Sequence, residues 1–309
     1  WRKRTLSHWL ALAGAGLAFL GALAVLWRAF SVEHLAEHPF GAVIDWLPAG
    51  SSVIRIGAAL DPLSAVTLLF VAVTVLMIFV YSVGYHNHGQ PEGKDDRPGL
   101  PPHGAEVKDD HGHSHRVATV EPMYSRFFAL ISLFAFAMYL LVVSDNLLTL
   151  YVGWEIMGLC SYLLIGFWYA RPSARDAAVK AFMTTRIGDA FMLLGLAALY
   201  SLTGTFRFSE ILGNPQTLEI LSSSASGILG LSWAGLIGIL LLMGTVGKSA
   251  QFPLHVWLPD AMEGPTPVSA MIHAATMVSA GVYLALRFFP LIAAGWQPGG
   301  ALTAPMLFI

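Results

Sequence analysis

Residues 62–83 constrain this chain most, because the stretch is long, apolar and free of charged side chains. The hydrocarbon core of a bilayer is about 30 Å thick, and a helix needs roughly 20 apolar residues to cross it. Further segments meet that requirement, and another begins near Leu302. We therefore expect an all-α fold, a polytopic transmembrane helix bundle. The further segments are 9–30, 127–144, 147–170, 178–201, 227–247 and 266–289.

The composition agrees with a membrane protein. Hydrophobic residues make up 56% of the 309 residues and charged residues only 12%, whereas soluble domains carry about 25% charged residues. The net charge of -2 gives no basis for a nucleic-acid partner. The single cysteine, Cys160, excludes an internal disulfide. We expect a multi-pass integral membrane protein whose surroundings are lipid.

One helix of the bundle is predicted to be discontinuous. Prolines at 253, 259, 265 and 267 fall between two apolar segments, and proline removes a backbone donor and breaks helices. Non-helical backbone survives at membrane depth only where protein or water supplies partners. A short helical piece at 254–262 fits between the breaks. Discontinuous helices of this kind are common in ion-transporting folds.

The chain divides into transmembrane helices at 1–85, a His-rich polar loop at 86–121 and a second helix bundle at 122–309. The loop is rich in Gly, Pro, Asp and His, and His111, His113 and His115 alternate along it. Alternating histidines can bind zinc or nickel weakly, but the composition favours a disordered insertion. We expect no metal site.

Lysine and arginine in short loops predict the orientation, because cytoplasmic loops of membrane proteins carry an excess of them. If every span crosses once, three basic regions fall on one side, which we take as the cytoplasmic side. The opposite side carries mostly acidic residues with Arg55 and Arg207. The three basic regions contain Arg2, Lys3, Arg4, Lys94, Arg97, Lys108, Arg116, Arg126, Arg171 and Arg175.

Charged residues inside spans are the main candidates for function. Placing a charge at the bilayer centre costs about 2.5–3.5 kcal/mol on insertion scales, so such residues face a partner or water. Glu155 lies near the middle of its span and Lys248 ends an apolar one. Glu155 is either a structural carboxylate or one whose proton affinity follows a nearby cation. Lys248 either snorkels to the interface or relays protons.

Three further residues are candidates on the same grounds. Arg186 and Asp189 are three residues apart and share a helix face, so they form a local ion pair or tune Glu155 and Lys248. Histidine in general titrates near neutral pH, and His273 is either a relay or a hydrogen-bonded packing residue. Asp61 precedes Pro62, where helix capping and a transport role are both open.

Signatures of other chemistry are missing from the sequence. There is no Gly-rich dinucleotide fingerprint, no complete phosphate-binding loop, no cysteine pattern for iron–sulfur clusters and no zinc-protease motif. We therefore expect no catalytic residues, no redox centre and no cofactor on this chain.

Several motifs resemble the large antiporter-like subunit of respiratory complex I, called the L subunit in bacteria and NADH dehydrogenase subunit 5 in mitochondria. The matches are specific and run from about residue 60 to 290. They include Tyr-Val-Gly-Trp-Glu at 151–155, Arg-Ile-Gly-Asp at 186–189, the stretch from Gly247 to Ala270 and Ile272 to Met277. Leu-Asp-Pro-Leu-Ser at 60–64 and Tyr-Ser-Arg-Phe-Phe at 124–128 also resemble this family.

The resemblance implies a proton-translocating subunit of NADH:quinone oxidoreductase, coupling quinone reduction by NADH or another donor to pumping. Other membrane subunits would be its partners and the bacterial inner (plasma) membrane its location. The family's glutamate, lysine and histidine match Glu155, Lys248 and His273. In this interpretation ionised Glu155 holds the proton on Lys248, which passes it towards His273. Residues 122–309 would be the first half of the antiporter-like fold, with a helix before Trp1 and a second half elsewhere.

Alternatives keep the fold and change the assembly. The chain could belong to a cation/proton antiporter, a membrane-bound hydrogenase or an inorganic-carbon uptake complex. The His-rich insertion at 86–121 departs from the usual family pattern, in which a short turn precedes the motif at 124–128. A purely structural subunit is disfavoured by the charges within the spans.

Overall fold

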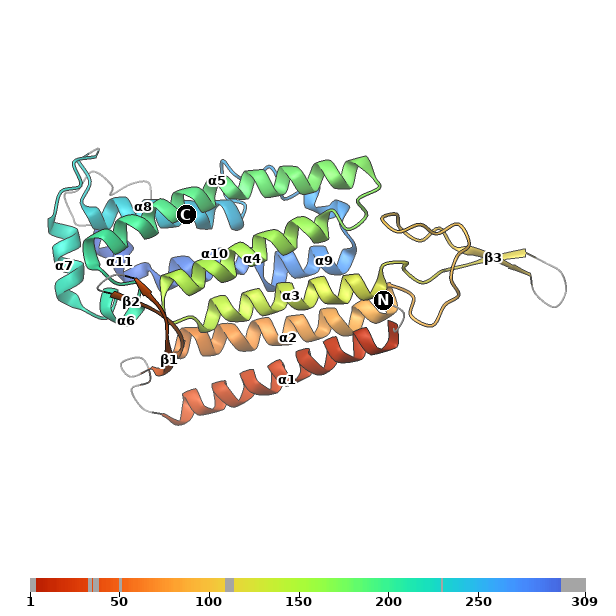
Figure 1. Cartoon of the computed structure of the whole chain (residues 1–309), viewed down its shortest axis with the longest axis horizontal. Coiled ribbons are helices and arrows are strands. Elements are labelled where there is room, and N and C mark those ends of the chain that lie inside the picture. Colours follow the sequence, from red (N-terminus) through yellow and green to blue (C-terminus); the bar gives the residue numbers. More distant parts are fainter. Residues whose placement is uncertain are drawn as a thin grey trace.

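The computed structural model describes residues 4–32, 35, 39–49, 52–108, 114–228 and 230–295. Long helices form the body of the molecule, and two short hairpins lie outside it (Figure 1). The helices are α1 Arg4–Ser31, α2 Pro62–Tyr85, α3 Tyr124–Val143, α4 Leu147–Ile165, α5 Pro172–Thr203, α6 Phe208–Ile211, α7 Pro215–Ser223, α8 Trp233–Lys248, α9 Thr266–Ala270, α10 Met277–Arg287 and α11 Phe289–Gly295. The strands are β1 Phe40–Ala49, β2 Ser52–Leu60, β3 Ala105–Lys108 and β4 Ser114–Val117.

The long helices lie side by side and run back and forth between the two ends of the molecule (Figure 1). The connection from α2 to α3 lies at one end, which we name the loop end. Strands β1 and β2 lie at the other, which we name the hairpin end. The start of α1 and the connection from α4 to α5 also lie at the loop end. The predicted clustering of basic segments on one side is therefore confirmed for their described residues.

Six described helices are long and apolar enough to cross a membrane: α1, α2, α3, α4, α5 and the segment Thr266–Arg287. The predicted fold class, a polytopic helix bundle, is confirmed. Helix α8 is shorter than the predicted span at 227–247, because the described residues 224–228 and 230–232 form bends, a turn and a bridge before it begins. At 1.5 Å per residue its 16 residues cover about 24 Å. The span expected near Leu302 lies outside the described residues.

The discontinuity is present but differs from the prediction. Helix α8 ends at Lys248, as expected. The helix predicted at 254–262 is wrong: turns occupy most of it, and only a short 3-10 segment, Asp260–Glu263, follows. The span predicted at 266–289 is not continuous either, because a π-helical turn, Met271–Ala275, separates α9 from α10. The chain is therefore interrupted twice in this region.

The two hairpins were not predicted. Strand β1 pairs antiparallel with β2, with an irregularity between Asp45 and Leu47. Strand β3 pairs antiparallel with β4 inside the His-rich segment and projects from the loop end (Figure 1). The expected disorder of 86–121 is therefore wrong for residues 86–108 and 114–121. His111 and His113 lie outside the described residues.

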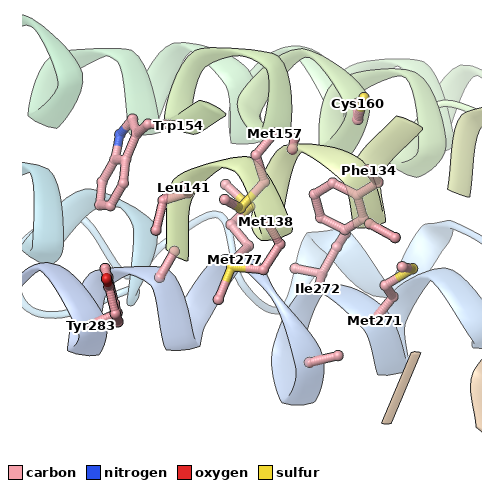
Figure 2. Packing of buried hydrophobic residues seen from close by; sticks show 14 of the residues in the cluster. Phe134, Met138, Leu141, Trp154, Met157, Cys160, Met271, Ile272, Met277 and Tyr283 are labelled. Atoms are coloured by element: carbon pink, nitrogen blue, oxygen red, sulfur yellow. The ribbon is translucent and has the colours of Figure 1, made fainter. Parts of the chain in front are cut away.

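The segment Thr266–Arg287, divided by the π-helical turn, is named here the interrupted helix. The core of the bundle lies between α3, α4 and this interrupted helix. Figure 2 shows Phe134 and Met138 of α3 beside Met157 of α4, with Ile272 and Met277 below them. All five side chains are fully buried. Burying a large apolar side chain contributes about 1.5–3 kcal/mol in water-soluble proteins, whereas inside a bilayer close packing itself holds helices together. This packing places the π-helical turn against the centre of the bundle.

Candidate functional site

Lys248 is fully buried at the last turn of α8. It reaches the interior because α5 and α8 approach closely along a glycine seam. A Cβ added at Gly188 would lie 2.5 Å from the carbonyl oxygen of Met243, and one added at Gly247 would lie 3.3 Å from that of Thr185. Small residues permit such close backbone approach between membrane helices. Snorkelling to the interface is therefore excluded in this structure.

Asp189 of α5 is the carboxylate nearest Lys248. Its Oδ2 lies 3.3 Å from Lys248 Nζ, and both side chains are almost completely buried. The indole Nε1–H of Trp154 donates to Asp189 Oδ1 at 2.6 Å, while the Trp154 ring lies 5.7 Å from Lys248 Nζ. A cation over a tryptophan face is attracted by the ring quadrupole. Trp154 therefore contacts both members of the ion pair.

Glu155 does not contact Lys248 directly. Its carboxylate forms an ion pair with Arg186, in which the two side chains are 22% and 31% exposed. Arg186 Nη1 lies 4.0 Å from Asp189 Oδ2. Any influence of Glu155 on Lys248 therefore acts through Arg186 and Asp189, which lie between them. The four residues form a continuous series of opposite charges across α4, α5 and α8.

Hydrogen bonding within this series is incomplete. Among the described residues, Lys248 Nζ, Asp189 Oδ2 and Glu155 Oε1 have no hydrogen-bond partner. Lys248 and Asp189 are close enough for an ion pair but are not aligned for a hydrogen bond. Gly158 leaves the room that the ammonium occupies, since a Cβ there would lie 2.6 Å from Nζ. Unpaired buried polar atoms are costly and are found at functional sites.

His273 lies in the π-helical turn, where its Nε2 is buried without a hydrogen-bond partner in the described part of the chain. Its ring stacks on Trp257, with centroids 6.5 Å apart. The indole N–H of Trp257 donates to the carbonyl oxygen of Gly247 at 3.0 Å. Trp257 thus connects His273 to the residue before Lys248. No sequence pattern predicts this link, because Trp257 lies in a segment without helical periodicity.

A second charge pair, partly buried, lies at the hairpin end. Asp61 caps α2, where its side chain accepts from the Ser64 amide and the Ser64 hydroxyl accepts from the Asp61 amide, so the predicted capping is confirmed. Both guanidinium Nη atoms of Arg287 also donate to the Asp61 carboxylate. Burial acts to raise the pKa of Asp61, but Arg287 and the cap outweigh it and hold the pKa below its usual range.

The comparisons with known proteins identify the family of the helix bundle. The profile of the family described as "NADH:quinone oxidoreductase/Mrp antiporter, TM" matches residues 144–303. This chain belongs to that family. The profile described as "NADH-Ubiquinone oxidoreductase (complex I), chain 5 N-terminus" matches residues 46–91. The helix bundle is therefore that of an antiporter-like membrane subunit.

Relatives show how much of such a subunit is present. NAD(P)H-quinone oxidoreductase chain 5 of Synechocystis sp. is 44% identical over 90% of this chain and 34% of its own length. The chloroplastic NAD(P)H-quinone oxidoreductase subunit 5 of Nephroselmis olivacea is 41% identical over 93% of this chain and 38% of its own length. The chain spans about a third of the length of the curated relatives it matches. It is a multi-pass integral membrane protein.

Solved structures share the fold. A chain of the Mrp complex from Dietzia sp. superposes with a TM-score of 0.68 and 31% identity, over 94% of this chain and 26% of its own length. A chain of the archaeal membrane-bound sulfane sulfur reductase superposes with a TM-score of 0.66 and 20% identity, over 93% and 48%. The latter likeness concerns the fold alone.

Two more buried titratable groups of this family member lie at the loop end, outside the spans. His86 follows α2 and contacts Phe127, with ring centroids 4.0 Å apart; burial lowers its pKa to about 3. Glu121 is fully buried and accepts from the Trp168 indole at 3.3 Å; burial raises its pKa. Through these contacts the His-rich segment packs against the bundle.

No group of three metal-ligating side chains occurs among the described residues.

Proposed function

We propose that this chain provides a proton-translocating half of the membrane subunit of an NAD(P)H–quinone oxidoreductase complex. The carrying observation is Lys248, fully buried and facing Asp189 without a hydrogen bond. An ionisable group inside a membrane bundle, next to a carboxylate, suits proton uptake and release. Membership of the family and 44% identity to chain 5 of Synechocystis sp. support the parent complex.

The charges would act in sequence. Lys248 holds a proton while Asp189 is ionised beside it, because an opposite charge favours the charged form. Arg186 lies between Asp189 and Glu155, so a change of charge near Glu155 shifts Arg186 relative to Asp189. A closer Arg186 neutralises Asp189 and weakens its hold on the ammonium. Lys248 then releases its proton towards the side of Trp257 and His273.

The chain's own residues supply no redox chemistry in this proposal. Electron transfer from the nicotinamide donor to quinone would occur on partner subunits, and the other membrane subunits of the complex would pack against this one. We propose the bacterial inner membrane as the location, although the similar proteins include cyanobacterial and chloroplastic ones.

A cation/proton antiporter is the second candidate, favoured by the structural likeness to the Mrp complex from Dietzia sp.. The two functions share the Lys248 site and differ in their energy source. Co-purification of the tagged parent protein separates them, because a quinone oxidoreductase brings redox subunits. Sodium-dependent proton movement in the absence of NAD(P)H and quinone would favour the antiporter.

The test of the proposed function is proton pumping by the complete complex in proteoliposomes. Lys248→Ala and Glu155→Gln should each lower the protons moved per electron. Lys180→Met is the matched control, since Lys180 forms only a half-exposed pair with Asp260 at 2.6 Å. Full stoichiometry in both Lys248→Ala and Glu155→Gln would overturn the proposal.

A further inference from the structure

The interrupted helix that carries His273 is bonded at both of its ends to one uninterrupted helix, α2. At the loop end, the backbone N–H of Thr266, the first residue of α9, donates to the Tyr85 hydroxyl at 3.2 Å. Tyr85 is the last residue of α2. At the hairpin end, Arg287, the last residue of α10, binds Asp61, which caps the start of α2. Helix α2 therefore spans the interrupted helix from end to end.

The hairpin end fixes the rotation of α10 as well as its position. The Arg287 guanidinium donates to Asp61 through two nitrogens and also to the Tyr283 hydroxyl. That hydroxyl donates in turn to the carbonyl oxygen of Val142 in α3, at 2.8 Å. Because these contacts come from one side of α10, a rotated α10 could not keep them.

The π-helical turn between the two ends is closed by Thr276. Its backbone N–H and its hydroxyl both donate to the carbonyl oxygen of Met271, at 3.0 and 2.9 Å. Thr276 is fully buried, so water does not compete for that carbonyl. Met271 and Ile272 at the start of the turn are also fully buried, and Ile272 lies beside Phe134 of α3 (Figure 2). The turn is thus fixed by a side-chain hydrogen bond within the core.

The turn and the end contacts depend on each other through helix geometry. A π-helical turn holds one more residue than an α-helical turn. If it relaxed to regular α-helix, α10 would rotate by about 100° and shift by about 1.5 Å relative to α9. Arg287 and Tyr283 would then leave Asp61 and Val142. The extra residue is therefore held in the turn that contains His273.

We propose that Thr276 and the Asp61–Arg287 pair are positioning residues for proton transfer, because they hold the π-helical turn that stacks His273 on Trp257. This inference rests on the proposed function. It adds that the geometry of the relay is set by α2, a helix that contributes no charge to the Lys248 series. Loss of the turn moves the His273 ring off Trp257 and away from the Lys248 side.

The first test uses Thr276→Val and Thr276→Ser in the complete complex reconstituted in proteoliposomes. Valine keeps the shape and removes the hydroxyl donor, whereas serine keeps the donor. We expect Thr276→Val to lower proton translocation on the order of tenfold, the effect of one lost buried hydrogen bond, while Thr276→Ser stays near wild type. A structural role alone would lower the amount of complex and leave the protons moved per electron unchanged, and that result would overturn the proposal.

The second test combines Thr276→Val with Asp61→Asn, which retains an acceptor for the Ser64 amide but loses the charge facing Arg287. Both changes act on one turn. The pumping rate of the double variant should therefore be about that of the slower single variant, and the two losses should not multiply. Multiplicative losses would overturn the proposal. If Lys248→Ala abolishes pumping and Thr276→Val leaves it intact, this inference fails and the proposed function stands.

Discussion

Asp61 with Arg287 and Asp189 with Lys248 are ion pairs between helices, the first partly and the second almost completely buried, and their hydrogen bonding differs. Arg287 donates to Asp61 through two nitrogens and also to Tyr283, and Asp61 accepts from the Ser64 amide. Lys248 Nζ and Asp189 Oδ2 are 3.3 Å apart, but neither atom has a hydrogen-bond partner among the described residues.

This difference separates an ion pair that holds two helices in position from an ion pair that can gain or lose a proton. A bidentate arginine–carboxylate pair is geometrically specific and strong, so the Asp61 pair suits the fixing of helix ends. The Asp189 pair has one additional hydrogen bond, from the Trp154 indole, and a buried pair with so few gains little over its desolvation cost. The Asp189 pair is therefore closer in free energy to its neutral form. The predictions below test whether the bonding pattern determines the role.

The largest effect is expected from removing one charge of the Asp189–Lys248 pair and keeping the other. Asp189→Asn keeps an acceptor for the Trp154 indole but leaves Lys248 without a carboxylate, which should destabilise the protein by about 3–5 kcal/mol. Asp189→Asn combined with Lys248→Met removes both charges and should recover much of that loss. Thermal unfolding of the purified protein in detergent measures both. Additive losses would show that the two charges are not coupled.

The next effect concerns the seam that buries Lys248. Gly188→Ala places a Cβ 2.5 Å from the Met243 carbonyl oxygen, so α5 and α8 must separate, at a cost of about 3 kcal/mol. The measurement is the unfolding midpoint, together with proton pumping. Gly14→Ala in α1 is the control, because nothing lies within 4 Å of its added Cβ. Equal melting points for the two variants would contradict the close packing of α5 against α8 at Gly188.

His86 provides a third case, a buried titratable group without a charged partner. Burial holds its pKa near 3, against 6.5 in the unfolded chain. The unfolded state therefore takes up a proton first as the pH falls, and stability is lost progressively from about pH 6.5 to pH 3. At pH 5 the loss amounts to about 2 kcal/mol. His86→Phe should remove this part of the pH dependence in unfolding measured at pH 7.5 and 5. An unchanged pH dependence would exclude His86 as its source.

The smallest effect is expected from the exposed pair Lys180–Asp260, whose side chains are 45% and 43% exposed. Such pairs contribute about 0–1 kcal/mol because water and salt screen them. Lys180→Met should change the unfolding free energy by less than about 1 kcal/mol, and raised salt should have no further effect on the variant. A loss as large as that of Asp189→Asn would remove the distinction based on burial and bonding.

The sequence predicts the helical class and the charged residues of the site, because apolar length and isolated charges are local properties. In the structure Glu155, Arg186, Asp189 and Lys248 come together, one of the two arrangements that the sequence left open. Their pairing could not be predicted, since which carboxylate meets Lys248 depends on how the glycine seam rotates α5 against α8. The π-helical turn at His273 was missed for a similar reason: contacts with α2 and the Thr276 hydroxyl stabilise it, and neither leaves a periodic signal.

The end of α8 at Lys248, inside the bundle, has an electrostatic consequence. The last turn of a helix carries a partial negative charge of about half an elementary charge, and here that turn contains Lys248 and lies inside the protein. Its carbonyls are bonded to protein groups: Thr245 to the Ser249 amide, Val246 to the Gln251 amide and Gly247 to the Trp257 indole. Lys248 therefore has two negative neighbours of different kinds. Asp189 can be neutralised by a proton, whereas the helix terminus cannot, so the ammonium always retains a permanent counter-charge in the bilayer.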